Sequence, residues 1–61
     1  MRDWLIERRK KLSFTQADVA AAAKISQPSY CNIETGKISP RPATAKRLAK
    51  VLKVSWTKFF E

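Results

Sequence analysis

The segment from Phe14 to Gly36, which reads FTQADVAAAAKISQPSYCNIETG, constrains the fold more than any other part of the sequence. It holds two short amphipathic stretches, and each opens on a hydroxyl residue that can cap a helix. Thr15 and Asp18 have the spacing of a capping box, and Ser26 precedes a proline suited to a first helical turn. The only glycine of the chain fits the left-handed position that ends many helices. The segment therefore predicts two helices joined by a tight corner.

Similar signals divide the rest of the chain into helices, and none predicts a strand. Residues 2–11 place an acidic residue in a first turn and basic residues in a last turn, as the helix dipole favours. Pro42 fits the first turn of a helix that runs to Lys53, with an apolar stripe made of Ala45, Leu48, Ala49 and Leu52. Ser55 can cap a short helix over residues 56–60. We predict an all-α fold of five helices.

Length and composition narrow the classes of protein. Sixty-one residues predict one domain, 1–61, that buries only about 60% of the surface of the unfolded chain. The lone Cys31 excludes an internal disulfide, and the absence of histidine argues against a zinc site. No apolar run approaches the ~20 residues of a membrane span, so we expect a cytoplasmic protein. Thirteen basic against five acidic residues give a net charge of +8, which favours a polyanionic partner.

The second stretch of the corner has an uncharged outer side. At ~100° per residue, Tyr30 and Ile33 define the side that faces the core. Pro28 then lies on the opposite, outer side of the helix, and Asn32 lies next to that side. Gln27 lies at the N-terminal end of the helix. Glutamine and asparagine can pair with adenine in a major groove, and a proline can contact a thymine methyl. The alternative is that these are ordinary polar helix residues, and a first-turn proline has a structural explanation already.

The sequence resembles the Cro/C1-type (XRE) helix-turn-helix family, which includes the lambdoid phage repressors. The resemblance spans residues 5–60 and rests on the joint spacing of Arg9, Thr15-Gln16, Val19-Ala20, Ile25-Ser26, Ile33-Glu34-x-Gly36, Pro40 and Leu48-Ala49-x-x-Leu52-x-Val54-Ser55. It implies a five-helix, lambda-repressor-like DNA-binding domain whose second and third helices form the helix-turn-helix. The third helix, about residues 27–35, would then enter the major groove.

The resemblance also implies roles for individual residues. It places three side chains at base edges, namely Gln27, Pro28 and Asn32. It places four others at the phosphate backbone, namely Gln16, Ser26, Lys37 and Ser39. Arg9 and Glu34 hold the positions of an ion pair that ties the first helix to the end of the third.

The chain departs from the family pattern at several positions. The family usually has glycine where this chain has Ser13, Lys24 and Lys53. We predict a positive φ at both lysines, at a cost on the order of 1 kcal/mol each. Arg41 replaces the usual hydroxyl cap of the fourth helix and can instead reach a phosphate or the minor groove.

The remaining basic residues are expected to contribute mainly at long range. In the run of residues 8–11, Arg9 is assigned to the ion pair, and its neighbours Arg8, Lys10 and Lys11 are predicted to be solvated. Four more cations are expected mostly away from the DNA groove, namely Lys46, Arg47, Lys50 and Lys58.

The aromatic residues fall near the two ends of the chain. We predict that Trp56 and Phe59 are core residues that seal the fifth helix against the first and fourth. Trp4 and Phe60, if partly exposed, are the candidate dimer surface. A homodimer is expected to form there or only on the DNA.

These observations favour a sequence-specific double-stranded DNA-binding protein that binds a pseudo-palindromic operator and regulates transcription, most simply as a repressor. The alternative is a protein-interaction or antitoxin-like adaptor that uses its aromatic C-terminus, with DNA binding secondary. An enzyme is not expected, because histidine, paired carboxylates and a phosphate-binding glycine loop are all missing. No cofactor, small-molecule ligand or membrane contact is expected.

Overall fold

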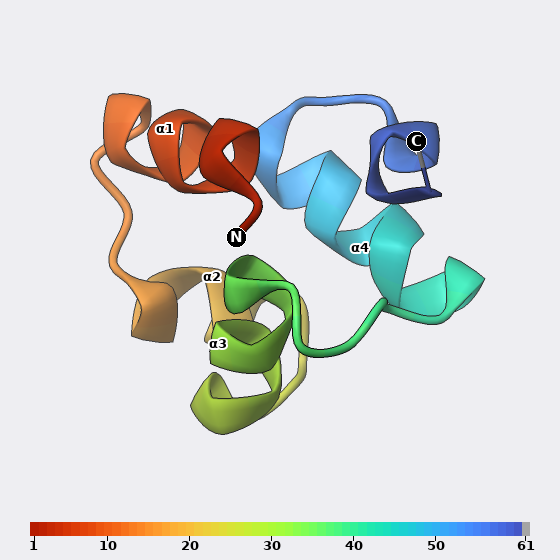
Figure 1. The fold of residues 1–61 in the computed structure, drawn as a ribbon. Coiled ribbons are helices and arrows are strands. Elements are labelled where there is room, and N and C mark those ends of the chain that lie inside the picture. Colours follow the sequence, from red (N-terminus) through yellow and green to blue (C-terminus); the bar gives the residue numbers. More distant parts are fainter. Residues whose placement is uncertain (61) are drawn as a thin grey trace.

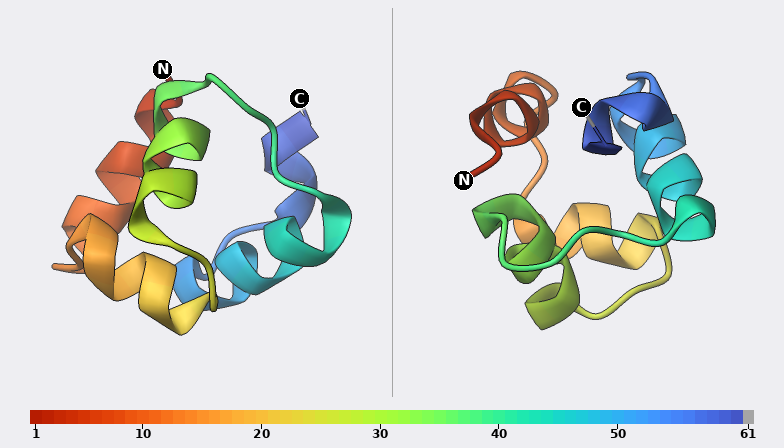
Figure 2. Two further views of the ribbon diagram at one scale, coloured as in Figure 1. Left: turned by 90° about the horizontal axis from the view of Figure 1, so that it is seen from below. Right: turned by 45° about the vertical axis from the view of Figure 1, so that its right-hand side comes forward.

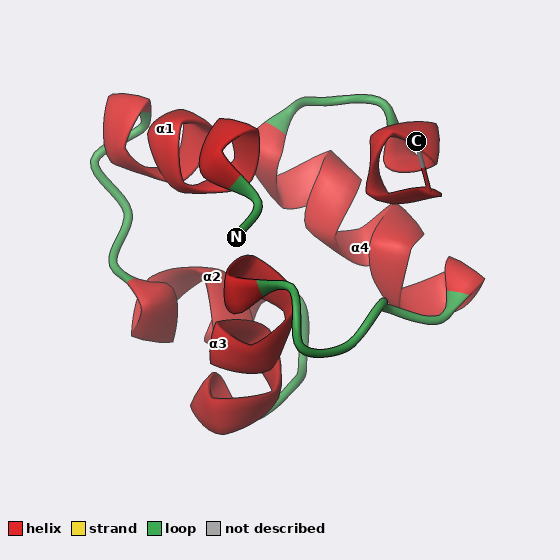
Figure 3. Cartoon of the chain, in the orientation of Figure 1, coloured by secondary structure: helices red, strands yellow, loops and turns green. Residues whose placement is uncertain are grey.

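The computed structural model describes residues 1–60, which form four α-helices and one 3-10 helix (Figure 1). In chain order these are α1 (Asp3–Lys11), α2 (Gln16–Ala22), α3 (Gln27–Thr35), α4 (Pro42–Leu52) and the 3-10 helix η1 (Trp56–Phe60). No strand occurs among these residues, so the all-α prediction is confirmed (Figure 3). The count of five α-helices is not, because the fifth element winds as a 3-10 helix.

The ends of α2 and α3 follow from residues close by in the sequence. Thr15 Oγ1 accepts a hydrogen bond from the Asp18 backbone N–H at 3.0 Å, and Asp18 Oδ2 accepts one from the Thr15 N–H at 2.9 Å. This reciprocal capping box opens α2 as predicted. Ser26 Oγ caps α3 by accepting from the Ser29 N–H at 3.3 Å. Gly36, with φ 85°, ends α3 in the left-handed conformation.

Three other helices end in the left-handed conformation without a glycine. Lys24 has φ 61° after α2, and Lys53 has φ 57° after α4, which confirms the prediction for both lysines. Ser13, after α1, likewise has φ 61°. Each side chain there meets a Cβ–carbonyl clash that costs on the order of 1 kcal/mol.

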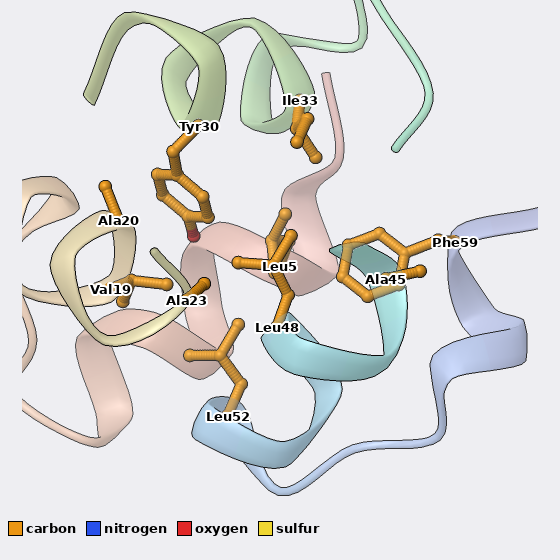
Figure 4. Packing of buried hydrophobic residues seen from close by; sticks show 10 residues of the cluster. All are labelled: Leu5, Val19, Ala20, Ala23, Tyr30, Ile33, Ala45, Leu48, Leu52 and Phe59. Carbon is orange, nitrogen blue, oxygen red and sulfur yellow. The ribbon is translucent and has the colours of Figure 1, made fainter. Parts of the chain in front are cut away.

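The hydrophobic core draws on all five elements (Figure 4). Its buried members are Leu5, Val19, Ala20, Ala23, Tyr30, Ile33, Ala45, Leu48, Leu52 and Phe59. The alanines of α2 present little bulk, so α2 can lie close to α3 and α4, on which it packs. Figure 4 shows Tyr30 and Ile33 projecting from α3 toward Leu5 and Leu48. The apolar side predicted for α3 therefore faces the core.

Two sequence predictions, one about Trp56 and one about Arg8, are wrong. Trp56 is 36% exposed, because Phe59 takes the buried position against Trp4 of α1, with ring centroids 5.1 Å apart. Arg8 is not simply solvated. Its Nε donates to the Leu52 carbonyl at 2.8 Å, and this bond satisfies a backbone acceptor at the end of α4.

The helices leave one side of α3 uncovered. In the view from below, no helix lies in front of α3, and α2 crosses behind its lower end (Figure 2, left). Among residues 1–60, no helix is long and apolar enough to cross a lipid bilayer.

Candidate nucleic-acid interface

The uncovered side of α3 presents the uncharged side chains singled out by the sequence. Gln27 and Pro28 are exposed, whereas Asn32, Thr35 and Cys31 are half-buried. Among residues 1–60, the side-chain amides of Gln27 and Asn32 have no hydrogen-bond partner. Both amides can therefore offer a donor and an acceptor to another molecule.

The N-terminal end of α3 is held by contacts within its own first turn. Ser26 is exposed, but its hydroxyl is engaged, because it caps α3 and donates to Ser29 Oγ at 2.9 Å. No side chain from another helix hydrogen-bonds to this end among the described residues. Gln27 and Pro28 therefore protrude from a turn that is fixed only locally.

The C-terminal end of α3 is fixed by Arg2, a residue that the sequence did not single out. The Arg2 guanidinium donates to the carbonyl of Ile33 through Nη1, which also reaches the carbonyl of Ile38 at 3.1 Å. Its Nη2 donates to Ser39 Oγ at 3.2 Å, and its backbone N–H donates to the Glu34 carbonyl at 2.9 Å. Arg2 thus ties the end of α3 to the loop that follows it. More than 30 positions separate Arg2 from Ile33 and Ile38, so no local pattern could have revealed the contact.

Glu34 is the centre of a second set of contacts at this end. Arg9 Nε donates to Glu34 Oε2 at 2.7 Å, and Arg9 Nη2 donates to Oε1 at 3.2 Å. Arg9 also donates to the carbonyl of Phe14 at 2.9 Å, which fastens the loop between α1 and α2. The exposed fraction of the side chain is 13% for Arg9 and 4% for Glu34. The structure therefore joins α1 to the end of α3 through a nearly buried ion pair.

The ionisation of these groups reflects their surroundings. Burial alone would raise the pKa of Glu34, but hydrogen bonds from Arg9 and Gln16 outweigh burial and leave that pKa below its usual value of 4.5. The hydrogen bond to Glu34 raises the pKa of Arg9. Burial, and then the nearby Glu34 carboxylate, raise the pKa of Tyr30, whose hydroxyl is buried without a hydrogen-bond partner among residues 1–60. The carboxylate is accordingly charged at neutral pH and the phenol is not.

Gln16, which the resemblance assigns to a phosphate contact, also has a hydrogen-bond partner inside the domain. It lies at the start of α2 and is half-buried. Its Nε2 donates to Glu34 Oε1 at 2.9 Å, so one of its two amide N–H groups is used inside the domain. The second N–H is the one left for an outside acceptor.

The loop after α3 carries the remaining side chains assigned to phosphates. Lys37 and Ser39 are both exposed, and the Lys37 backbone N–H donates to the Asn32 carbonyl at 2.9 Å. Arg41 is exposed at the N-cap of α4 and makes no side-chain cap. These side chains therefore line the loop that leaves the C-terminal end of α3.

The comparisons with known proteins agree with this geometry. A family model described as helix-turn-helix matches residues 5–59. The chain belongs to the Cro/C1-type (XRE) helix-turn-helix family. Over 61 residues it is 41% identical to the uncharacterized HTH-type transcriptional regulator YqaF of Bacillus subtilis (strain 168), covering all of this chain and 80% of that protein. No solved structure matches.

In this helix-turn-helix domain, η1, which carries Trp56, Phe59 and Phe60, lies apart from α3 (Figures 1 and 2). Phe60 is 48% exposed and stacks edge-on with Trp56, with centroids 5.9 Å apart. Trp4 is half-buried, and Lys58 Nζ lies 5.1 Å from its ring centroid. Of the two residues expected at a dimer surface, Phe60 is thus the more accessible. Residues 1–60 hold no group of three or more side chains suited to bind a metal ion.

Proposed function

We propose that this helix-turn-helix domain binds a specific sequence of double-stranded DNA, with α3 in the major groove, and that it represses transcription. The observation that carries the proposal is the uncovered side of α3, where two unpartnered amides project from a domain of net charge +8. A side that was merely solvated would ordinarily carry lysine and glutamate. The relative YqaF is named as an HTH-type transcriptional regulator, which supports a regulatory role.

Base reading is assigned to the exposed part of α3. Gln27 and Asn32 would each pair with an adenine edge through the amide oxygen and nitrogen. Pro28 would present an apolar surface to a thymine methyl. An uncharged face suits these contacts, because amides pair with adenine and an apolar group meets a thymine methyl, whereas lysine and glutamate would read guanine and cytosine.

Phosphate contacts are assigned to the two ends of the helix-turn-helix. Lys37 supplies a full positive charge from the loop after α3, and Ser39 adds a hydroxyl contact from the same loop. Ser26 lies at the opposite end of α3, and its hydroxyl would reach a phosphate by turning its proton away from Ser29. Gln16 would use the amide N–H that Glu34 leaves free. Such contacts set register and affinity but carry no sequence information.

A two-fold operator would require two copies of the domain, with half-sites about one DNA turn apart. The exposed ring of Phe60, with Trp4 nearby in the fold, is the proposed contact between copies. The exposed Trp56–Phe60 pair also favours the alternative of an adaptor that binds another protein through its aromatic C-terminus, with DNA binding secondary.

The test compares Gln27→Ala with Lys37→Ala on an operator selected from a random duplex library. Gln27→Ala should weaken binding to the selected operator by ~1–3 kcal/mol and relax the preference at one base pair. Lys37→Ala should weaken binding to every duplex and reduce the slope of log K against log salt by about 1. Affinities are measured by fluorescence anisotropy at two salt concentrations.

Lys10→Ala is the matched control for Lys37→Ala, because Lys10 is exposed on α1 and has the same charge. It should change binding little beyond the small effect of net charge. Equal losses for Gln27→Ala on selected and random duplexes would refute base reading by α3. Binding of a protein partner by a domain that selects no duplex would favour the adaptor.

A further inference from the structure

A groove runs between the end of α2 and the outer side of α4. It has a volume of about 320 Å³ and is lined by Ala22, Lys24, Arg47, Lys50 and Val51. Ala22 and Val51 supply apolar surface, and the other three residues are exposed cations. No residue of α3 and no acidic residue lines it. The groove is therefore separate from the side of α3 assigned to DNA.

The cations of this groove have no electrostatic partner within the described part of the chain. The ion pair found in residues 1–60 is Arg9–Glu34, on other elements. The three like charges around the groove repel one another, and its apolar floor stays open to solvent at the exposed Ala22 and the half-buried Val51. An acidic, partly apolar surface that covered the groove would neutralise the repulsion among the cations and bury the exposed apolar floor.

Lys24 contributes the third cation of the groove from the turn after α2. It has φ 61°, a conformation that strains every residue except glycine. The strain here places one more cation at the rim.

The apolar floor distinguishes between two kinds of polyanion. A DNA backbone would match the three charges but has no apolar group to fill the space between Ala22 and Val51. A peptide that carries both carboxylates and large apolar side chains matches both. About 320 Å³ lies at the small end of ligand pockets, which suits one or two side chains of leucine size rather than a whole ligand.

We propose that this groove docks an acidic amphipathic helix of a partner protein. One or two apolar side chains of the partner lie on Ala22 and Val51, and its flanking carboxylates pair with Lys24, Arg47 and Lys50. This is the helix-in-groove mode of recognition, with charges at the rim that set orientation and association rate. Docking there leaves α3 free, so the domain can hold DNA and the partner together.

The experiment titrates the ¹⁵N-labelled full chain with a capped synthetic peptide of about 14 residues that alternates glutamate with leucines at helical spacing. Amide shifts are expected at the groove and not on the outer side of α3. The variant Arg47→Gln/Lys50→Gln should weaken peptide binding by about 2- to 25-fold, from two exposed ion pairs. Its matched control Lys10→Gln/Lys11→Gln changes the net charge equally, on exposed α1 residues, and should bind as the unaltered chain does.

Lys24→Gly separates docking from stability. Glycine relieves the left-handed strain, so the thermal midpoint should rise by about 4 °C. Loss of the Lys24 cation should at the same time weaken binding of the peptide. A residue with only a structural role would not move these two readouts in opposite directions.

Three results would overturn the proposal. One is the absence of amide shifts at the groove. Another is equal binding of a peptide in which serine replaces every leucine, because the apolar floor would then have no part. The third is a loss of affinity for random duplex DNA in Arg47→Gln/Lys50→Gln as large as that in Lys37→Ala, which would make the groove a DNA surface. None of these bears on base reading by Gln27, which is measured on DNA alone.

Discussion

The two ends of α3 are held in different ways. The C-terminal end is fastened to both ends of α1, which is distant from it in the sequence. Arg2 makes the contact at the start of α1, and the Arg9–Glu34 ion pair makes the contact near its end. The N-terminal end has only the cap from Ser26, and it exposes Gln27 beside it. Distant contacts thus fix the C-terminal end, whereas the side-chain amide of Gln27 at the other end makes no hydrogen bond within residues 1–60 that DNA would have to break.

The largest effect on the difference between the two ends is expected when Glu34 is removed. Glu34→Ala leaves Arg9 nearly buried without its carboxylate, so the free energy of unfolding should fall by about 3–5 kcal/mol. Urea denaturation followed by circular dichroism measures the loss. Glu7→Ala, on the exposed side of α1, is the matched control and should change stability by less than about 0.5 kcal/mol. Similar losses in both variants would contradict the role of the ion pair.

Acid should lower the free energy of unfolding by less than Glu34→Ala does, because a protonated Glu34 can still accept hydrogen bonds. Its pKa in the folded domain lies below the usual 4.5. The ionised carboxylate therefore stabilises the fold above pH 4.5, and this contribution is lost as the pH falls through the folded pKa. The urea concentration at the unfolding midpoint, recorded from pH ~6 down to pH ~2, should therefore decrease below pH 4.5. In Glu34→Gln the same profile should be flatter, and an unchanged slope would assign the acid sensitivity to other groups.

Loss of Arg2 should have an intermediate effect. Arg2→Ala removes hydrogen bonds to the carbonyls of Ile33 and Ile38, at a cost of about 1–2 kcal/mol. Hydrogen exchange should accelerate in the last turn of α3 and in the loop through Ser39, and not at the start of α3. Arg47→Ala, an exposed arginine on α4, should leave both measurements unchanged. Uniform acceleration along α3 would show that Arg2 does not act at one end only.

The smallest expected effect lies at the N-terminal end. Ser26→Ala removes the local cap and should lower the free energy of unfolding by about 1 kcal/mol. Ser26→Asp keeps an oxygen acceptor at this position and should retain most of the stability. The thermal midpoints of the two variants are compared with that of the unaltered chain. A loss as large as that in Glu34→Ala would mean that the two ends are equally important.

Much of the fold could be predicted from the sequence, because the signals are local. The capping box of Thr15 and Asp18, and the glycine after Thr35, set helix ends through atoms a few residues apart. The left-handed lysines 24 and 53 followed from a glycine pattern carried over from the family. The outward position of Gln27 followed from the helical period once Tyr30 and Ile33 were assigned to the core.

The candidate site could be predicted only in part. Sequence placed Gln16 among the phosphate contacts, but the fold turns one of its amide N–H groups to Glu34. Sequence left Arg8 in solvent, but the fold brings it to the carbonyl of Leu52. A long polar side chain takes whichever partner the packing brings near, and the partner of Arg8 is 44 positions away.

The amino-acid sequence by itself determined where the helices begin and end and which side of each is apolar, since caps and periodicity act over single turns. Only the tertiary structure decided which aromatic ring is buried, with Phe59 and not Trp56 against Trp4. It also decided that Arg2 fastens the end of α3 and that α2 and α4 enclose a basic groove. These features depend on how helices pack across long chain separations, where the shapes of several elements together select the contacts.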